Sequence, residues 1–165
     1  DIMHSLIDGS ASTLTGDVSL RDRENVTLQS FDSRPNAPVT ARFSHEDPAA
    51  AAELTNYVDG LSASGSTAMY QTLLEALRET DPAGGIPSIV LLSDGQDTVG
   101  PRFSKFKEEY ERLPAAQRSV PVFVILYGDA SESEMRELAE LTGGEVFDAL
   151  GGDLAAAFKE IRGFQ

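Results

Sequence analysis

The chain has 165 residues, which is enough for one domain and too few for two ordinary ones. Its 13 Lys and Arg stand against 27 Asp and Glu, and a surface with a net charge of −14 repels phosphate backbones and anionic lipids, so we expect neither a nucleic-acid partner nor direct membrane insertion. The absence of cysteine excludes disulfides, thiolate metal sites and cysteine nucleophiles.

The first part of the chain predicts the end of a helix followed by two short strands. Apolar residues at helical spacing over 2–7, stopped by Gly9, indicate that the chain begins within a helix. Alternating residues over 26–31 and 39–43 predict two half-buried strands. Because the connection between these strands is short and rich in turn-forming residues, we expect them to pair antiparallel.

A helix is expected to follow the second strand. Asp47 suits its N-cap, Pro48 its first helical position, and Gly60 its end. The expected buried face of this helix consists of Ala50, Leu54, Val58 and Leu61.

From residue 68 on, helices and strands alternate. The expected helices have apolar residues at helical spacing and run from about 68 to 80, over 103–113, from a capping box at 131–134 to Gly143, and from Asp153 onward. The expected strands are apolar runs at 89–92, 122–127 and 145–147, of which the first suits a strand covered on both faces. Strict alternation requires crossover connections and parallel pairing. We therefore predict a single α/β domain over residues 1–165, a doubly wound, mostly parallel open sheet with an antiparallel edge hairpin.

Carboxylates follow the first of these apolar runs. Open α/β sheets bind ligands outside the carboxyl ends of their strands, and Asp94 and Asp97 come directly after the run at 89–92. These side chains therefore suit a ligand site at the edge of the sheet. The alternative, that the two carboxylates only form a turn that leads into the next helix, stays open.

A hydroxyl-rich loop at 62–67 leads into the helix expected from residue 68. Its hydroxyls and the carboxylate of Asp94 would be hard oxygen ligands, which suit Mg²⁺ or Mn²⁺ and do not suit Zn²⁺. The alternative is that Ser66 or Thr67 merely caps the helix.

The two loops together carry a resemblance to a known family. The segments Ser64-Gly65-Ser66-Thr67-Ala68-Met69-Tyr70 and Ile89-Val90-Leu91-Leu92-Ser93-Asp94-Gly95-Gln96-Asp97 resemble the second and third metal-loop motifs of the von Willebrand factor A (vWA) family, in its bacterial form. The resemblance implies a Rossmann-like fold with a divalent-cation site of the metal-ion-dependent adhesion (MIDAS) type. It implies Thr67 and Asp94 as metal ligands, with Ser64, Ser66 and Asp97 at the rim of the site.

The resemblance also implies how such a domain works. A partner protein commonly completes the cation's coordination with an acidic side chain, so we expect a protein-binding or adhesion module and not an enzyme. Some bacterial relatives adjoin solute-binding domains in cell-envelope proteins, which implies an extracytoplasmic location.

The family's first metal loop has an Asp-x-Ser-x-Ser motif after a first strand. Because this chain resembles the family only from the helix that follows that strand, we expect the strand and its motif to be missing here. We therefore expect Mg²⁺ or Mn²⁺ to bind this chain weakly or not at all, although the full-length protein can hold the ion. We also expect the gap in the sheet to be closed by altered pairing or by a strand of a second copy.

Two other functions remain as alternatives. The first is a vWA scaffold that binds proteins without metal. The second, more remote, is an Mg²⁺-dependent phosphohydrolase, because residues 93–98 superficially resemble an Asp-x-Asp-x-Thr loop. The spacing argues against it, since Gln96 stands where the second Asp would be needed.

Overall fold

The computed structural model describes residues 2–8, 20–62, 66–93, 99–126, 132–148 and 159–161. The chain divides into two compact units. The first, here called the hairpin unit, comprises Asp1–Ser30, Asn36–Ser64 and Leu154–Phe164. The second, here called the sheet unit, comprises Phe31–Pro35, Gly65–Asp153 and Gln165.

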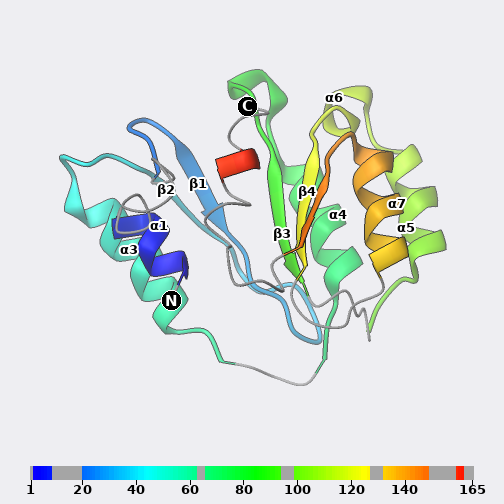
Figure 1. The fold of residues 1–165 in the computed structure, drawn as a ribbon, viewed down its shortest axis with the longest axis horizontal. Helices are drawn as coiled ribbons and strands as arrows, with labels where there is room; N and C mark the ends of the chain where they lie inside the picture. The colour runs from blue at the N-terminus through cyan, green and yellow to red at the C-terminus, as the bar shows by residue number, and fades with distance from the viewer. Residues whose placement is uncertain are drawn as a thin grey trace. The chain divides into compact units, whose positions relative to one another are not determined.

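The hairpin unit contains two described strands and two main helices. Its elements are α1 (Ile2–Asp8), β1 (Asn25–Leu28), β2 (Val39–Arg42) and α3 (Pro48–Asp59). The two strands pair antiparallel, with Asn25 opposite Arg42, as the short connection predicted (Figure 1). The opening helix is confirmed as well, while both strands are shorter than the alternation pattern indicated.

Helix α3 begins and ends where its capping residues predicted. The Asp47 carboxylate accepts a hydrogen bond from the Ala49 amide at 3.0 Å, Pro48 occupies the first turn, and Gly60 follows the last residue. Leu61 lies beyond this end and is 50% exposed, so its predicted place on the buried face was wrong. The buried residues of this unit's core are Ile7, Ala41, Phe43, Ala50 and Leu54.

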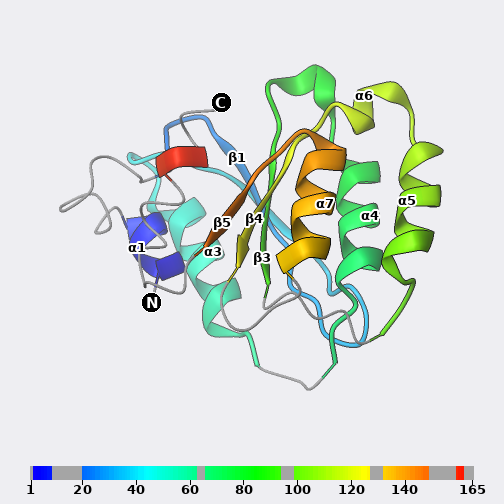
Figure 2. The same ribbon diagram turned by 45° about the vertical axis from the view of Figure 1, so that its right-hand side comes forward.

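The sheet unit alternates strands and helices as predicted. Its parallel sheet has the order β3-β4-β5, formed by β3 (Ile89–Ser93), β4 (Val122–Leu126) and β5 (Val146–Asp148). Three helices lie together on one side of this sheet in both views, namely α4 (Met69–Glu79), α5 (Phe103–Glu111) and α7 (Glu132–Thr142) (Figures 1 and 2). Two short helices that the sequence did not predict are η1 (Pro82–Gly84) and α6 (Ala115–Arg118).

The α/β fold class is confirmed, and the arrangement of the strands differs from the prediction in one respect. The described strands form two separate sheets, so the hairpin is not hydrogen-bonded to the parallel sheet. Among the described strands β3 pairs with β4 alone, and Ile89, Val90 and Leu92 are only half-buried. Full burial of this strand on both faces was therefore wrong, because a strand at the edge of its sheet has fewer neighbours than a central one.

The core of the sheet unit contains a row of stacked aromatic rings. Tyr70 and Phe103 have ring centroids 5.5 Å apart, and Phe106 and Tyr110 are 6.0 Å apart. All four rings are buried between α4, α5 and the sheet. Burying each such ring contributes roughly 1.5–3 kcal/mol, so this row is a main source of cohesion between α4 and α5.

Helix α7 ends in a Schellman motif that leads directly into β5. The Gly144 amide donates to the Ala139 carbonyl at 2.9 Å and the Gly143 amide to the Glu140 carbonyl at 3.3 Å. Gly143 has a φ of +74°, which a residue without Cβ adopts readily. The N-cap Ser131 of the predicted capping box lies outside the described residues, and the Glu134 carboxylate accepts a hydrogen bond from the Tyr70 hydroxyl.

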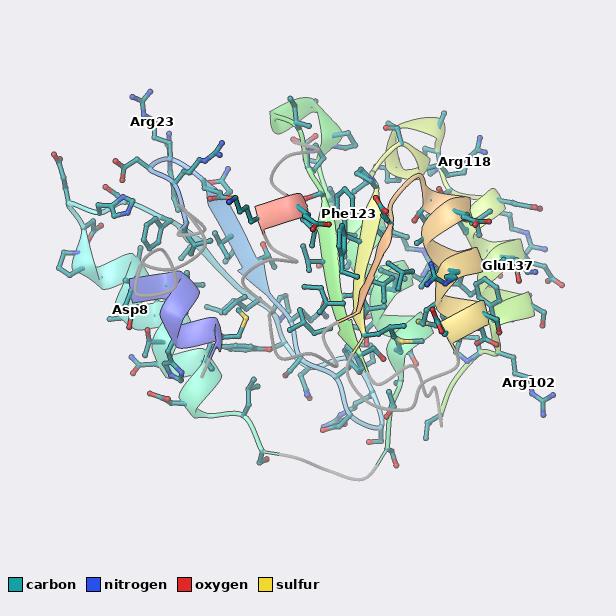
Figure 3. All side chains as sticks on the ribbon, viewed as in Figure 1. Asp8, Arg23, Arg102, Arg118, Phe123 and Glu137 are labelled. Carbon is teal, nitrogen blue, oxygen red and sulfur yellow. The ribbon has the colours of Figure 1, made fainter. Side chains whose placement is uncertain are left out.

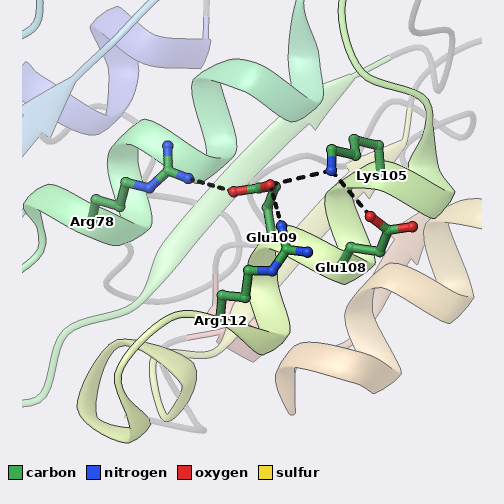
Figure 4. A network of polar contacts seen from close by, with 5 residues as sticks. All are labelled: Arg78, Lys105, Glu108, Glu109 and Arg112. Carbon is green, nitrogen blue, oxygen red and sulfur yellow. Dashed lines mark hydrogen bonds and ion pairs between the residues drawn. The ribbon is translucent and has the colours of Figure 1, made fainter.

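Helices α4 and α5 are also joined by a surface network of charges around Glu109 (Figure 4). The Glu109 carboxylate lies 2.8 Å from Arg112, 3.3 Å from Arg78 and 3.4 Å from Lys105, and Lys105 also contacts Glu108 at 3.1 Å. The hydrogen bond from Lys105 is the main cause that lowers the pKa of Glu109. Hydrogen bonds to Glu108 and then Glu109 raise the pKa of Lys105.

No helix in the described part of the chain combines the length and the apolar character that crossing a membrane requires.

Candidate metal-binding edge

The carboxyl end of β3 is fixed to the start of α4. Ser93, the last residue of β3, is buried, and its hydroxyl donates to the Met69 sulfur at 3.3 Å. Met69 is the first residue of α4. The end of β3 therefore lies beside the start of α4, which Thr67 precedes in the chain. The predicted ligand Asp94 and the rim residue Asp97 lie outside the described residues.

Thr67 is held by hydrogen bonds from two other segments of the sheet unit. Its carbonyl oxygen accepts from the Val99 amide at 3.0 Å, and the next amide, that of Ala68, donates to the Asp32 carbonyl at 2.6 Å. Thr67 and the neighbouring Ser66 are half-buried. The segment after β3, the segment before α4 and the turn of the hairpin therefore meet at Thr67.

The alternative that Ser66 or Thr67 caps α4 does not hold in the structure. The N-cap position is occupied by Ala68, whose side chain makes no capping hydrogen bond. The N-cap position of α4 therefore belongs to neither Ser66 nor Thr67. Ser64, the other predicted rim residue, lies outside the described residues.

Asp32 is a residue of this edge that the sequence did not single out. It lies in the turn of the hairpin, where its carboxylate accepts hydrogen bonds from the Ser33 hydroxyl at 3.1 Å and the Arg34 amide at 3.2 Å. Turn-forming residues around position 32 predicted a turn there. Nothing in the local pattern indicated that this turn reaches the loop before α4, because the two segments are far apart in the sequence.

The chemical types of the oxygen donors at this edge suit a hard divalent cation. Thr67 and Ser66 offer hydroxyl oxygens, and Asp94 carries a carboxylate. Mg²⁺ and Mn²⁺ prefer such oxygens and keep several waters. The described residues contain no group of three or more His, Cys, Asp or Glu placed to hold a metal ion. A cation here would therefore depend on water, on Asp94 and on a partner for much of its coordination.

The expectation that the chain lacks an Asp-x-Ser-x-Ser sequence requires a correction. Asp8-Gly9-Ser10-Ala11-Ser12 has this spacing. Asp8 is the last residue of α1, where it is exposed (Figure 3), whereas the first-loop motif of the family follows a strand. Residues 9–12 lie outside the described residues. The pattern is present, and its aspartate ends a helix.

The fold and this edge define the class of protein. It is an α/β protein in which the end of β3 contacts the start of α4 at the carboxyl edge of a parallel sheet. A family model of the von Willebrand factor type A domain matches residues 13–147, which is more than half of the chain, and the chain belongs to this family.

The match confirms the family resemblance, and it begins after the Asp8–Ser12 pattern. Membership of the family indicates a protein-interaction module. A comparison with curated proteins found no significant match to this chain.

Proposed function

We propose that this domain binds a protein partner through a divalent cation, Mg²⁺ or Mn²⁺, which Thr67 and Asp94 hold weakly in this chain at the carboxyl edge of β3. The observation that supports this most directly is the pair of backbone hydrogen bonds that fix Thr67 between the segment after β3 and the hairpin turn. Ser64, Ser66 and Asp97 would form the rim. The bound ion would supply positive charge for an acidic side chain of the partner.

The net negative charge of the chain explains why an acidic partner would need the cation in order to bind. At a net charge of −14 the domain repels an acidic partner at long range. A bound divalent ion reverses the sign of the field locally, where the partner's carboxylate arrives. Binding of an acidic partner is therefore expected to depend on the ion and to vanish with a chelator.

The test is a thermal melt with and without millimolar Mg²⁺ or Mn²⁺. An ion present at about 100 times its dissociation constant adds about 2.7 kcal/mol, or roughly 5–10 °C for a domain of this size. The rise should disappear in Asp94→Ala and Thr67→Ala and persist in Glu140→Ala, which removes an exposed carboxylate from α7. A rise that survives in Asp94→Ala would overturn the proposed ligands.

A second variant tests the role of the Asp8–Ser12 pattern. Because Asp8 ends helix α1, we expect Asp8→Ala to leave the response to Mg²⁺ or Mn²⁺ unchanged. The same melts measure it. Loss of the response in Asp8→Ala, with the metal-free melting temperature unchanged, would instead identify residues 8–12 as the first metal loop.

A vWA scaffold that binds its partner without metal is the second candidate. The observation in its favour is that the described residues contain no group of three or more His, Cys, Asp or Glu that could hold a metal ion. No response to either cation in the melts, together with partner binding that persists in a chelator, would select it.

We propose further that the domain is not an enzyme. Gln96 stands where a phosphohydrolase loop would need its second aspartate. Mg²⁺-dependent hydrolysis of an aryl phosphate that is lost in Asp94→Ala would contradict this.

Two further proposals concern assembly and location. Because we expect the family's first strand to be missing from the sheet, we propose that a strand of a second copy can close the gap, to be tested by light scattering over a concentration series. A monomer at all concentrations would exclude this assembly.

We also propose an extracytoplasmic, cell-envelope location, to be tested by fractionation of the source cells.

A further inference from the structure

We infer that Asp32 is a positioning residue for Thr67 and acts through the turn Phe31–Pro35, here called the tip. This inference rests on the proposed function, because it names a residue on which the cation affinity of the same edge depends. It goes beyond that function in assigning a role to a segment that contains no proposed ligand.

The first step is that the Asp32 side chain closes the tip. Its Oδ1 atom accepts from the Arg34 amide at 3.2 Å and from the Ser33 hydroxyl at 3.1 Å. The Asp32 amide in turn donates to the Arg34 carbonyl at 3.1 Å, and Phe31 and Pro35 form a bridge across the base. A side-chain oxygen that accepts from the amide two residues on holds a turn of this kind in one conformation.

The second step is that two contacts attach the closed tip to the rest of the sheet unit. Phe31 packs against the hydrophobic core of the sheet unit. The Asp32 carbonyl accepts from the Ala68 amide at 2.6 Å, and Ala68 is the N-cap of α4. The orientation of the peptide after Asp32 therefore determines where the Ala68 amide lies.

The third step connects this bond to Thr67. Ala68 follows Thr67 directly, and the Thr67 carbonyl is held on its other side by the Val99 amide at 3.0 Å. Two hydrogen bonds from different segments thus fix the backbone that carries the Thr67 hydroxyl. If the tip loses its internal hydrogen bonds, one of these two restraints weakens and the hydroxyl is no longer held in place for the cation.

The experiment compares Asp32→Ala with Asp32→Asn. Asparagine keeps an oxygen that can accept from the Arg34 amide and removes the negative charge, whereas alanine removes both. Glu53→Ala, on the exposed side of α3, is the matched control for loss of a carboxylate. Mn²⁺ affinity is measured by calorimetry, and exchange of the Ala68 amide by NMR without metal.

We expect Asp32→Ala to weaken Mn²⁺ binding about 10-fold, as loss of a group that orients a ligand commonly does, and to speed exchange of the Ala68 amide. Asp32→Asn and Glu53→Ala should stay close to the parent domain in both measurements. Equal affinity and exchange in Asp32→Ala and the parent would overturn the inference. Asp32→Asn as weak as Asp32→Ala would overturn it too, in favour of a direct effect of charge.

The two readouts separate this inference from the proposed function. A parent domain that shows no Mn²⁺ binding would contradict the proposed function. The inference is then decided by the Ala68 amide, and unchanged exchange in Asp32→Ala overturns it.

Discussion

Gly144 lies so close to the backbone of β4 that any side chain there must displace the strand. A Cβ built on Gly144 would lie 2.0 Å from the Val122 carbonyl oxygen and 2.5 Å from its carbon. These are backbone atoms of a fully buried strand, so they cannot move aside as a flexible side chain would.

We therefore expect Gly144→Ala to lower the free energy of unfolding by about 3 kcal/mol or more. The neighbouring Gly143→Ala is the control, because a Cβ on Gly143 meets nothing within 4 Å. Its left-handed φ of +74° alone should cost about 1 kcal/mol. Urea unfolding of both variants measures the difference, and equal losses would contradict the packing argument.

Tyr110 gives a prediction about pH. Burial raises the pKa of its phenol, opposed in part by the positive charge of Arg118, and the hydroxyl donates to the Arg118 carbonyl at 2.8 Å. Since the folded-state pKa lies above the unfolded value of about 10, this stabilisation is complete below that value and is lost as the pH rises through the folded pKa.

NMR of the tyrosine ring carbons over an alkaline titration measures this pKa. Tyr110→Phe should remove a signal that titrates above the usual tyrosine range and should reduce the alkaline loss of stability. A Tyr110 signal that titrates at the ordinary value would show that the buried environment does not persist in solution.

At the scale of elements, the charge network around Glu109 links α4 to α5. Among the described residues, Glu109 forms ion pairs with three cations, whereas Glu108 forms one, with Lys105. We expect Glu109→Gln to lower the melting temperature more than Glu108→Gln. The difference should shrink in about 1 M salt, where screening is nearly complete over these distances. A difference that is independent of salt would mean that Glu109 acts through packing.

Local patterns predicted the helices and strands well because their signals are local. Asp47 and Pro48 begin α3 and Gly143 ends α7 through contacts within a few residues. The apolar pattern did not identify the buried position in α7 that a threonine occupies. Thr142 is buried and Leu141 only half-buried, because the Thr142 hydroxyl donates within its own helix and accepts from the Val122 amide at 3.3 Å.

The pairing of strands depends on contacts between segments far apart in the chain, and the sequence predicted this pairing less well than the positions of the helices and strands. The periodicity of β1 and β2 identified a hairpin but not that it forms its own sheet. At the candidate site, the sequence indicated that Thr67 lies in a loop leading into a helix, and α4 begins at Met69. Asp32 could not be found, because its contact with Ala68 joins segments that no spacing rule connects.

At the scale of the whole molecule, the net negative charge of the domain bears on how the proposed cation site would attract a partner. A net charge of −14 makes each copy of the domain repel the next and repel acidic proteins. The proposed cation would convert one point of this surface into an attractive one. Partner binding should therefore be abolished by a chelator, which removes this local positive charge.

The aromatic row between α4 and α5 also makes the domain its own optical probe. The chain has no tryptophan and four tyrosines, so its ultraviolet emission comes from tyrosine alone. Tyr70 and Tyr110 both contact Phe106 in this row, and Tyr70 lies on the first turn of the helix that follows Thr67. A change at that helix start would alter the surroundings of a natural fluorophore, and ion or partner binding can be followed by emission without any attached label.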